Sequence, residues 1–77
     1  MSVMTREIVA VSDARHAASD GRLRAARLRA KLSQADIARA VGVTEATVSR
    51  WESGVRRPRR EEAKRLAALL QVLEETG

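Results

Sequence analysis

The stretch LSQADIARAVGVTEATVSRWESG, residues 32–54, decides the predicted fold of this chain. Ser33 is a typical N-cap residue before a short apolar-periodic segment, and Asp36 places a negative charge near the start of that helix. Gly42 is suited to end the helix, because glycine adopts the left-handed conformation without a steric penalty. Thr44, another capping residue type, follows after one intervening residue. The pattern therefore predicts two short helices joined by a glycine turn.

The second helix of this pair is predicted to run from about Glu45 to Glu52, and Gly54 ends it. Val48 and Trp51 lie three residues apart and are predicted to face the protein interior. The other side chains are mostly small or polar, so the helix is narrow at its leading end. A B-DNA major groove is about 12 Å wide and admits one α-helix. The spacing is typical of a helix-turn-helix, although a structural hairpin in a helical bundle has the same connection.

Composition predicts an all-α fold with a small core. The chain has 77 residues, which suits a single domain, and Trp51 is its only aromatic residue. One proline and four glycines leave few turns for a protein of many short strands. Further helices are predicted over residues 20–31, capped by Asp20, and from about Arg60 to Glu75. The last of these has an apolar face formed by Ala63, Leu66, Leu70 and Leu73.

The predicted organisation has two parts, an N-terminal arm over residues 1–19 and a helix-turn-helix domain over residues 20–77. The arm contains a β-favouring apolar run from Ile8 to Val11. Three interpretations of the arm stay open, namely a flexible segment, a short strand that pairs with a second copy, and a helical extension of the domain.

Positive charge is concentrated in the middle of the chain. Residues 20–60 carry eleven basic and four acidic side chains, within a chain whose net charge is +5. A local excess of this size favours a polyanionic partner such as nucleic acid. The alternative interpretation is a solvated surface that keeps the protein soluble.

The sequence offers little for catalysis. It has no cysteine, and His16 is its only histidine. No metal-ligand cluster and no carboxylate pair has convincing spacing, so we expect neither enzyme activity nor a metal or other cofactor. The absence of cysteine fits a reducing cytoplasm, and neither a membrane-spanning run nor a signal peptide is recognisable.

The stretch LRAARLRAKLSQADIARAVGVTEATVSRWESGVRRPR, residues 23–59, strongly resembles the Xre/Cro-like helix-turn-helix domain of phage repressors and bacterial regulators, and the resemblance extends over roughly Leu23 to Leu70. The motifs that carry the resemblance are Leu32-Ser33-Gln34, Ala38, Gly42-Val43, Thr47-Val48-Ser49, Trp51-Glu52 and Gly54. The resemblance implies a compact bundle of four or five helices, of the lambda-repressor-like type with a central helix-turn-helix. It also implies binding to double-stranded operator DNA, usually as a dimer.

The resemblance implies a role for individual residues as well. Base contacts are expected from Glu45, Ala46, Thr47, Ser49 and Arg50. Contacts with the DNA backbone are expected from Ser33, Gln34, Thr44, Ser53, Arg56, Arg57 and Arg59. Arg27 and Glu52 occupy the places of a structural ion pair, and the alternative is two separate surface charges. Arginine binds guanine O6 and N7 in a bidentate manner, so Arg50 is the leading specificity residue, with a phosphate contact as its alternative.

The sequence departs from the family pattern at two positions. Lys31 stands where a glycine often precedes the Leu-Ser pair, so the preceding helix is expected to end differently. Arg59 replaces a common serine cap before the last helix, so that helix is expected to begin with a weaker cap.

The predicted function is that of a small transcriptional regulator, a repressor or autoregulator, which binds a palindromic operator as a homodimer. Leu69, Val72 and Leu73 on the last helix are the candidate dimer contacts. The alternative is an antitoxin or protein-interaction module whose last helix and N-terminal arm bind a partner protein. A membrane-surface function is disfavoured, because the arginines are spread over several helices instead of one amphipathic face.

Overall fold

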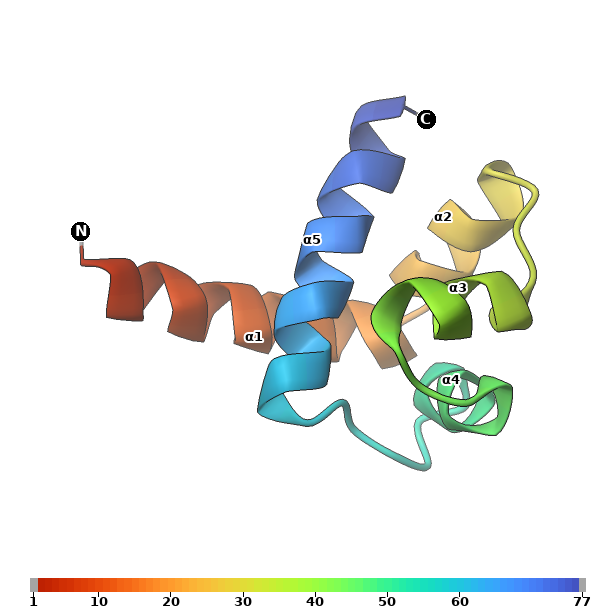
Figure 1. Ribbon diagram of the computed structural model, residues 1–77, viewed down its shortest axis with the longest axis horizontal. Coiled ribbons are helices and arrows are strands. Elements are labelled where there is room, and N and C mark those ends of the chain that lie inside the picture. The colour runs from red at the N-terminus through yellow and green to blue at the C-terminus, as the bar shows by residue number, and fades with distance from the viewer. Residues whose placement is uncertain (1, 77) are drawn as a thin grey trace.

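The computed structural model describes residues 2–76, and over that range the chain forms five α-helices and no strand. They are α1 (Val3–Ser19), α2 (Arg22–Arg29), α3 (Gln34–Val41), α4 (Glu45–Glu52) and α5 (Arg60–Thr76). The long helices α1 and α5 cross each other, while the three short helices gather beside α5 (Figure 1). The predicted all-α bundle of four or five helices is thus confirmed.

The core is aliphatic apart from one indole ring. Leu23 of α2, Ile37 of α3, Trp51 of α4, and Leu66 and Leu70 of α5 are almost completely buried. The predicted apolar face of α5 is buried along its length. Every helix therefore contributes side chains to one shared core, and the short helices are held in place by packing more than by their own propensity.

Residues 3–19 form the helix α1, which is the helical alternative of the three considered for this segment. Ser2 caps it by accepting a hydrogen bond from the Thr5 N–H. The small side chains of Ala14, Ala17 and Ala18 are buried, so α1 approaches α5 closely and adds to the core. Met1 and Gly77, the outer ends of the two predicted parts, lie outside the described residues.

The predicted helix over residues 20–31 is shorter in the structure, where α2 spans Arg22–Arg29. Gly21, with φ = 96°, occupies the N-cap position that was predicted for Asp20. The Asp20 carboxylate still accepts a hydrogen bond from the Arg22 N–H at 2.9 Å. The side-chain cap of α2 thus comes from Asp20, the residue before the N-cap Gly21, because the left-handed glycine turns the chain between α1 and α2.

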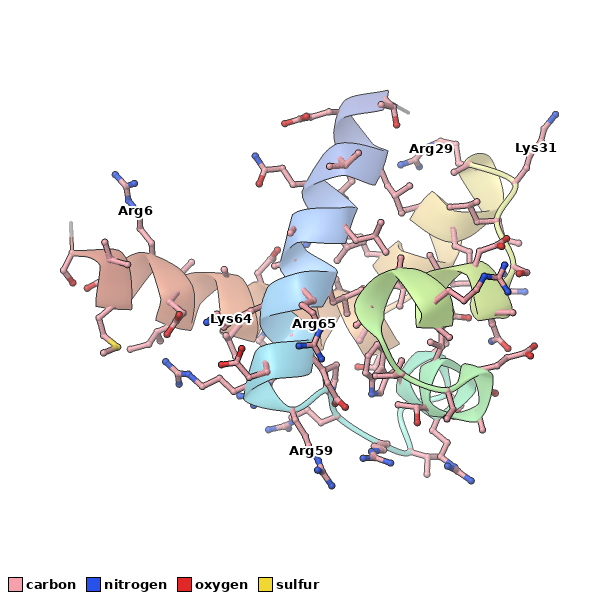
Figure 2. The ribbon with its side chains drawn as sticks, in the orientation of Figure 1. Arg6, Arg29, Lys31, Arg59, Lys64 and Arg65 are labelled. Atoms are coloured by element: carbon pink, nitrogen blue, oxygen red, sulfur yellow. The ribbon has the colours of Figure 1, made fainter. Side chains whose placement is uncertain are left out.

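Lys31 ends α2 in an unusual way. Its φ is +60°, and it is the only residue other than glycine with a positive φ in the part of the chain that the structure describes. The conformation lets the N–H groups of Lys31 and Leu32 bond to the carbonyls of Leu28 and Arg27. Figure 2 shows the lysine side chain extending outward from this turn. The departure from glycine therefore places a lysine in a backbone conformation that disfavours side chains.

At the start of α5, where the family often has a serine cap in place of Arg59, the capping carboxylate comes from inside the helix. Glu62 accepts a hydrogen bond from the Arg59 N–H at 2.9 Å, which satisfies one N–H group near the helix start. Glu61 and Glu62 also place negative charge in the first turn. The weak cap expected from Arg59 is thus offset by an acidic side chain inside the helix.

Arg22 links three helices through exposed ion pairs. Its guanidinium donates to Asp13 of α1 and to Glu74 of α5, with distances of 2.8–3.0 Å. These hydrogen bonds lower the pKa of both carboxyl groups. Because all three side chains are more than a third exposed, water screens the charges and the contribution to stability is small.

The three candidate dimer residues do not share one environment. Leu73 is 9% exposed and belongs to the core, and Leu69 is partly buried against it. Val72 is 56% exposed. Leu73 therefore packs within its own molecule, and Leu69 packs partly against the same core. Val72 is the most exposed of the three, and a dimer contact from any of them stays a prediction.

Candidate nucleic-acid interface

Helix α3, which leads into the turn to α4, is capped at both of its ends. At the start of α3, Ser33 and Asp36 form a reciprocal capping box, with distances of 3.0 and 2.8 Å. At its end, Gly42 has φ = 84° and donates to the Ala38 carbonyl. Arg65 of α5 donates from Nε to the Val41 carbonyl at 2.7 Å. The sequence signals for this helix are thus confirmed, with one long-range cap added to them.

The start of α4 is capped by Thr44, whose hydroxyl accepts a hydrogen bond from the Thr47 N–H at 3.2 Å. The helix then spans Glu45–Glu52, which are the predicted bounds. Because Val43 alone separates Gly42 from Thr44, α3 and α4 pack closely against each other. The two helices therefore form one helix-turn-helix unit.

The two faces of α4 differ sharply. Val48 and Trp51 are completely buried, as predicted. The Trp51 indole N–H has no acceptor among residues 2–76, so packing alone holds the ring. The opposite face consists of exposed side chains that no described part of the chain covers. These exposed residues are Glu45, Ala46, Ser49 and Arg50.

Thr47 differs from the other predicted base contacts. Its side chain is 7% exposed, and its hydroxyl lies 2.9 Å from the Thr44 hydroxyl. It lies one turn before the buried Trp51, on the side of α4 that faces the core. In this structure Thr47 therefore contributes to packing and to the cap of α4, and its base contact stays a prediction.

Arg27 and Glu52 form the ion pair implied by the family resemblance. The guanidinium donates from Nε and Nη2 to the two carboxylate oxygens, both at 2.9 Å. Gln34 donates from Nε2 to the same carboxylate at 3.1 Å, and Arg27 also donates to the Leu32 carbonyl. The two charged side chains are 10% and 6% exposed. This network fastens the end of α4 to α2 and to the start of α3.

The electrostatics of this network favour both charged forms. The hydrogen bond to Glu52 raises the pKa of Arg27. Burial by itself raises the pKa of Glu52, but hydrogen bonds from Arg27 and Gln34 outweigh burial, so that its pKa lies below the ordinary value. Both groups are therefore charged at neutral pH, and each compensates the other inside the protein.

The predicted backbone-contact residues fall into two groups. Thr44, Ser53 and Ser33 are exposed at helix ends, although the Ser33 hydroxyl already caps α3. Gln34 is half-buried and uses its amide to support Glu52. The second group, the arginines of the α4–α5 connector, comprises Arg56, Arg57 and Arg59.

The connector folds back against the end of α4. The N–H groups of Val55 and Arg56 both donate to the Arg50 carbonyl. Arg56, Arg57 and Arg59 have no ion-pair partner within residues 2–76. Figure 2 shows Arg59 directed away from the helices. The exposed face of α4 is thus flanked by uncompensated positive charge.

One arginine near this connector was not predicted. Arg15 of α1 donates from Nε to the Pro58 carbonyl at 2.9 Å. The two residues are 43 positions apart in the sequence, so no local pattern indicates their contact.

In the part of the chain that the structure describes, no group of three or more potential metal ligands is found. No helix among the described residues combines the length and the apolar character needed to cross a bilayer.

A family model described as Helix-turn-helix matches residues 23–75, which is more than two thirds of the chain. Comparison with curated proteins and with solved structures gave no match. The matched region contains all but the first residue of α2, the whole of α3 and α4, and all but the last residue of α5. The chain therefore belongs to the Xre/lambda-repressor-like family of helix-turn-helix proteins, the family of DNA-binding transcriptional regulators.

Proposed function

We propose that this protein is a sequence-specific regulator of transcription, a repressor or autoregulator, that inserts α4 into the major groove of an operator. The observation that carries the proposal is the exposed face of α4, formed by Glu45, Ala46, Ser49 and Arg50. The opposite face is anchored by Val48 and Trp51, so α4 presents one rigid outer surface. A single α-helix fits the major groove, where the base edges differ in their patterns of hydrogen-bond donors and acceptors.

The exposed side chains suit different base edges. Arg50 has two parallel donors for guanine O6 and N7, and Glu45 accepts from the amino group of cytosine. Ala46 is small and apolar, so it fits beside a thymine methyl group. Thr44 and Ser53 cap the two ends of α4, and we propose that they contact phosphates. The Arg27–Glu52–Gln34 network supports the proposal because it fixes the direction in which α4 projects.

Charge around α4 supports contact with the DNA backbone. Arg56, Arg57 and Arg59 are three guanidinium groups per chain without ion-pair partners within residues 2–76. Two copies on one palindromic operator then neutralise about six phosphates, which predicts a slope near −5 for log K against log salt concentration. We propose a homodimer on DNA with half-sites about 34 Å apart. Of the candidate dimer residues, Val72 is the exposed one.

A matched pair of charge insertions tests the proposal. Ser49→Glu places a carboxylate on the exposed face of α4, where it would meet the base edges and phosphates of the groove. Ala25→Glu places the same charge on an exposed position of α2. After duplexes have been selected from a random pool, Ser49→Glu should weaken binding by about 100-fold or more, whereas Ala25→Glu should change it less than about threefold. Equal losses in both variants would contradict a specific role for α4.

A second candidate function is supported by α1. Val3, Met4, Ile8 and Val9 are more than half exposed, so the projecting part of α1 offers apolar side chains to a partner protein, as in an antitoxin. The pool selection separates the two functions. A DNA-binding regulator enriches a defined sequence, whereas a pure protein-interaction module enriches none.

A further inference from the structure

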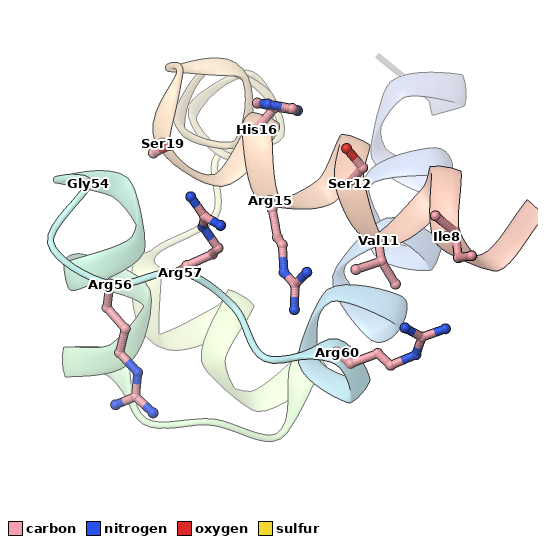
Figure 3. A pocket seen from close by; sticks show the side chains of 10 residues that line it. All are labelled: Ile8, Val11, Ser12, Arg15, His16, Ser19, Gly54, Arg56, Arg57 and Arg60. Carbon is pink, nitrogen blue, oxygen red and sulfur yellow. The ribbon is translucent and has the colours of Figure 1, made fainter.

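A cavity of about 350 Å³ lies between α1 and the connector that joins α4 to α5 (Figure 3). It is open to solvent, and its walls come from α1, from the residues after α4 and from the first turn of α5. A volume of this size is within the range of small-molecule sites. Six of its ten lining residues belong to α1, and the whole of α1 lies outside the residues that match the family model.

The charge around this cavity is strongly positive. Four of its lining residues are arginines, and none of its lining residues is acidic. Glu7 pairs with Arg60 at 2.9 Å. Arg15, Arg56 and Arg57 have no ion-pair partner within residues 2–76. Like charges gathered around a concave surface raise the local potential, and an anion in the cavity relieves their repulsion.

Two of the arginines are placed to hold an anion from opposite walls. Arg15 is half-buried, and its Nε–H bond to the Pro58 carbonyl fixes the direction of its guanidinium. Its two Nη groups have no acceptor within residues 2–76. Figure 3 shows Arg15 reaching from α1 toward the connector and Arg57 reaching from the connector toward α1, whereas Arg56 points away from α1. Guanidinium groups in such positions suit the three oxygens of a phosphoryl group.

The rest of the wall identifies the second part of the ligand. Ile8 supplies exposed apolar surface next to the nearly buried Val11, and Ser12 and Ser19 add hydroxyl groups. We propose that the cavity binds a phosphorylated small molecule, with the phosphoryl group between Arg15 and Arg57 and an apolar organic group against Ile8 and Val11. A bare phosphate ion satisfies the arginines and leaves this apolar wall uncovered, so it binds more weakly.

The position of the cavity predicts how a bound ligand changes the affinity for DNA. This part of the inference rests on the proposed function. Arg57 belongs to the connector that flanks α4, and a dianion held there occupies its donors and adds negative charge beside the DNA phosphates. The ligand therefore lowers the affinity for the operator. By thermodynamic linkage, bound operator lowers the affinity for the ligand by the same factor.

Calorimetric titration of the full chain with phenyl phosphate, without DNA and at constant ionic strength, tests the site. We expect saturable binding of one ligand per chain, about tenfold tighter than that of inorganic phosphate because the ring covers apolar surface. Arg15→Gln and Arg57→Gln should each weaken binding by about tenfold or more. Arg6→Gln removes an exposed arginine from the same helix and should leave binding unchanged.

Other results overturn the proposal. One is a titration in which phenyl phosphate gives no saturable binding. Another is equal affinity for phenyl phosphate in the wild type and in both cavity variants. A loss in Arg15→Gln alone would also overturn it, since that residue supports the fold through Pro58, whereas Arg57 is exposed. If Arg15→Gln instead weakens operator binding while the wild type binds no phenyl phosphate, the cavity takes a DNA phosphate and the small-molecule site is refuted. Because the titration contains no DNA, its failure leaves the proposed function standing.

Discussion

Removing Arg27 alone is expected to destabilise the protein far more than removing it together with its partner. In Arg27→Met the carboxylate of Glu52 stays buried and keeps only the hydrogen bond from Gln34. In the double variant Arg27→Met/Glu52→Leu, apolar side chains of similar length replace both charges. The comparison separates the cost of an orphaned charge from the net contribution of the pair.

The magnitude follows from burial and geometry. The paired side chains are 10% and 6% exposed and share two hydrogen bonds of 2.9 Å. Breaking such a pair by removing one partner costs about 3–5 kcal/mol, whereas replacing both partners costs about 1 kcal/mol or less. A domain of this size has a total stability of roughly 5 kcal/mol, so the single variant should be close to unfolding at 25 °C.

Urea unfolding followed by circular dichroism at 222 nm measures both variants. Arg29→Met serves as the control, because Arg29 is an exposed arginine of the same helix and the change should alter stability by less than about 0.5 kcal/mol. A loss below about 1 kcal/mol in Arg27→Met would refute the reasoning, since it would give the pair the strength of a solvated surface contact.

The same network predicts a dependence on pH. The pKa of Glu52 is lower in the folded protein than in the unfolded chain, so the unfolded chain binds the proton more readily. The stability that this group contributes is therefore fully present above its unfolded pKa, and it is lost as the pH falls through the folded pKa. In the double variant this part of the acid sensitivity should disappear, which urea unfolding at pH 7 and at acidic pH will show.

Three further predictions concern single positions. Lys31→Gly should raise the free energy of unfolding by about 1 kcal/mol, because glycine accepts the positive φ of 60° that a lysine side chain disfavours; a lower stability in urea unfolding would contradict this. Arg50→Ala should reduce the preference for the selected operator over random DNA by about 1–3 kcal/mol per half-site while non-specific affinity changes little, as measured by competitive fluorescence anisotropy; equal losses on both DNAs would make Arg50 a phosphate contact. Leu73→Asp should destabilise the monomer by about 3 kcal/mol or more, because it buries a charge, whereas Val72→Asp should leave the unfolding curve unchanged. If sedimentation on operator DNA shows the same dimer for Val72→Asp and the wild type, Val72 is not part of the dimer interface.

Local sequence signals predicted the centre of the fold well. Ser33, Gly42 and Thr44 act within a few residues of their own positions, so their roles as caps and turn can be inferred without knowing the rest of the molecule. The inward face of α4 follows in the same way from the spacing of Val48 and Trp51. These short-range patterns predict the buried face of α4 as the structure has it, and the DNA-binding role of the opposite face stays a prediction.

Longer-range features escaped prediction for a physical reason. An apolar stripe on α5 shows that Leu73 must be covered, but it does not show whether the same molecule or a second copy covers it. The packing of α1 against α5 joins segments that are more than forty residues apart in the sequence, and so does the hydrogen bond from Arg15 to Pro58. Thr47 lies one turn before Trp51 on the buried side of α4, but its hydroxyl group is polar, so its residue type did not indicate burial.

The most direct measurement is an NMR titration of the isotopically labelled protein with its selected duplex. If α4 enters the major groove, the largest changes in backbone amide shifts should fall on Glu45 to Arg50 and on the connector after Gly54, and these should be reduced with a non-selected duplex. Shift changes confined to α1 and α5, with the amides of α4 unaffected at saturating DNA, would contradict the account.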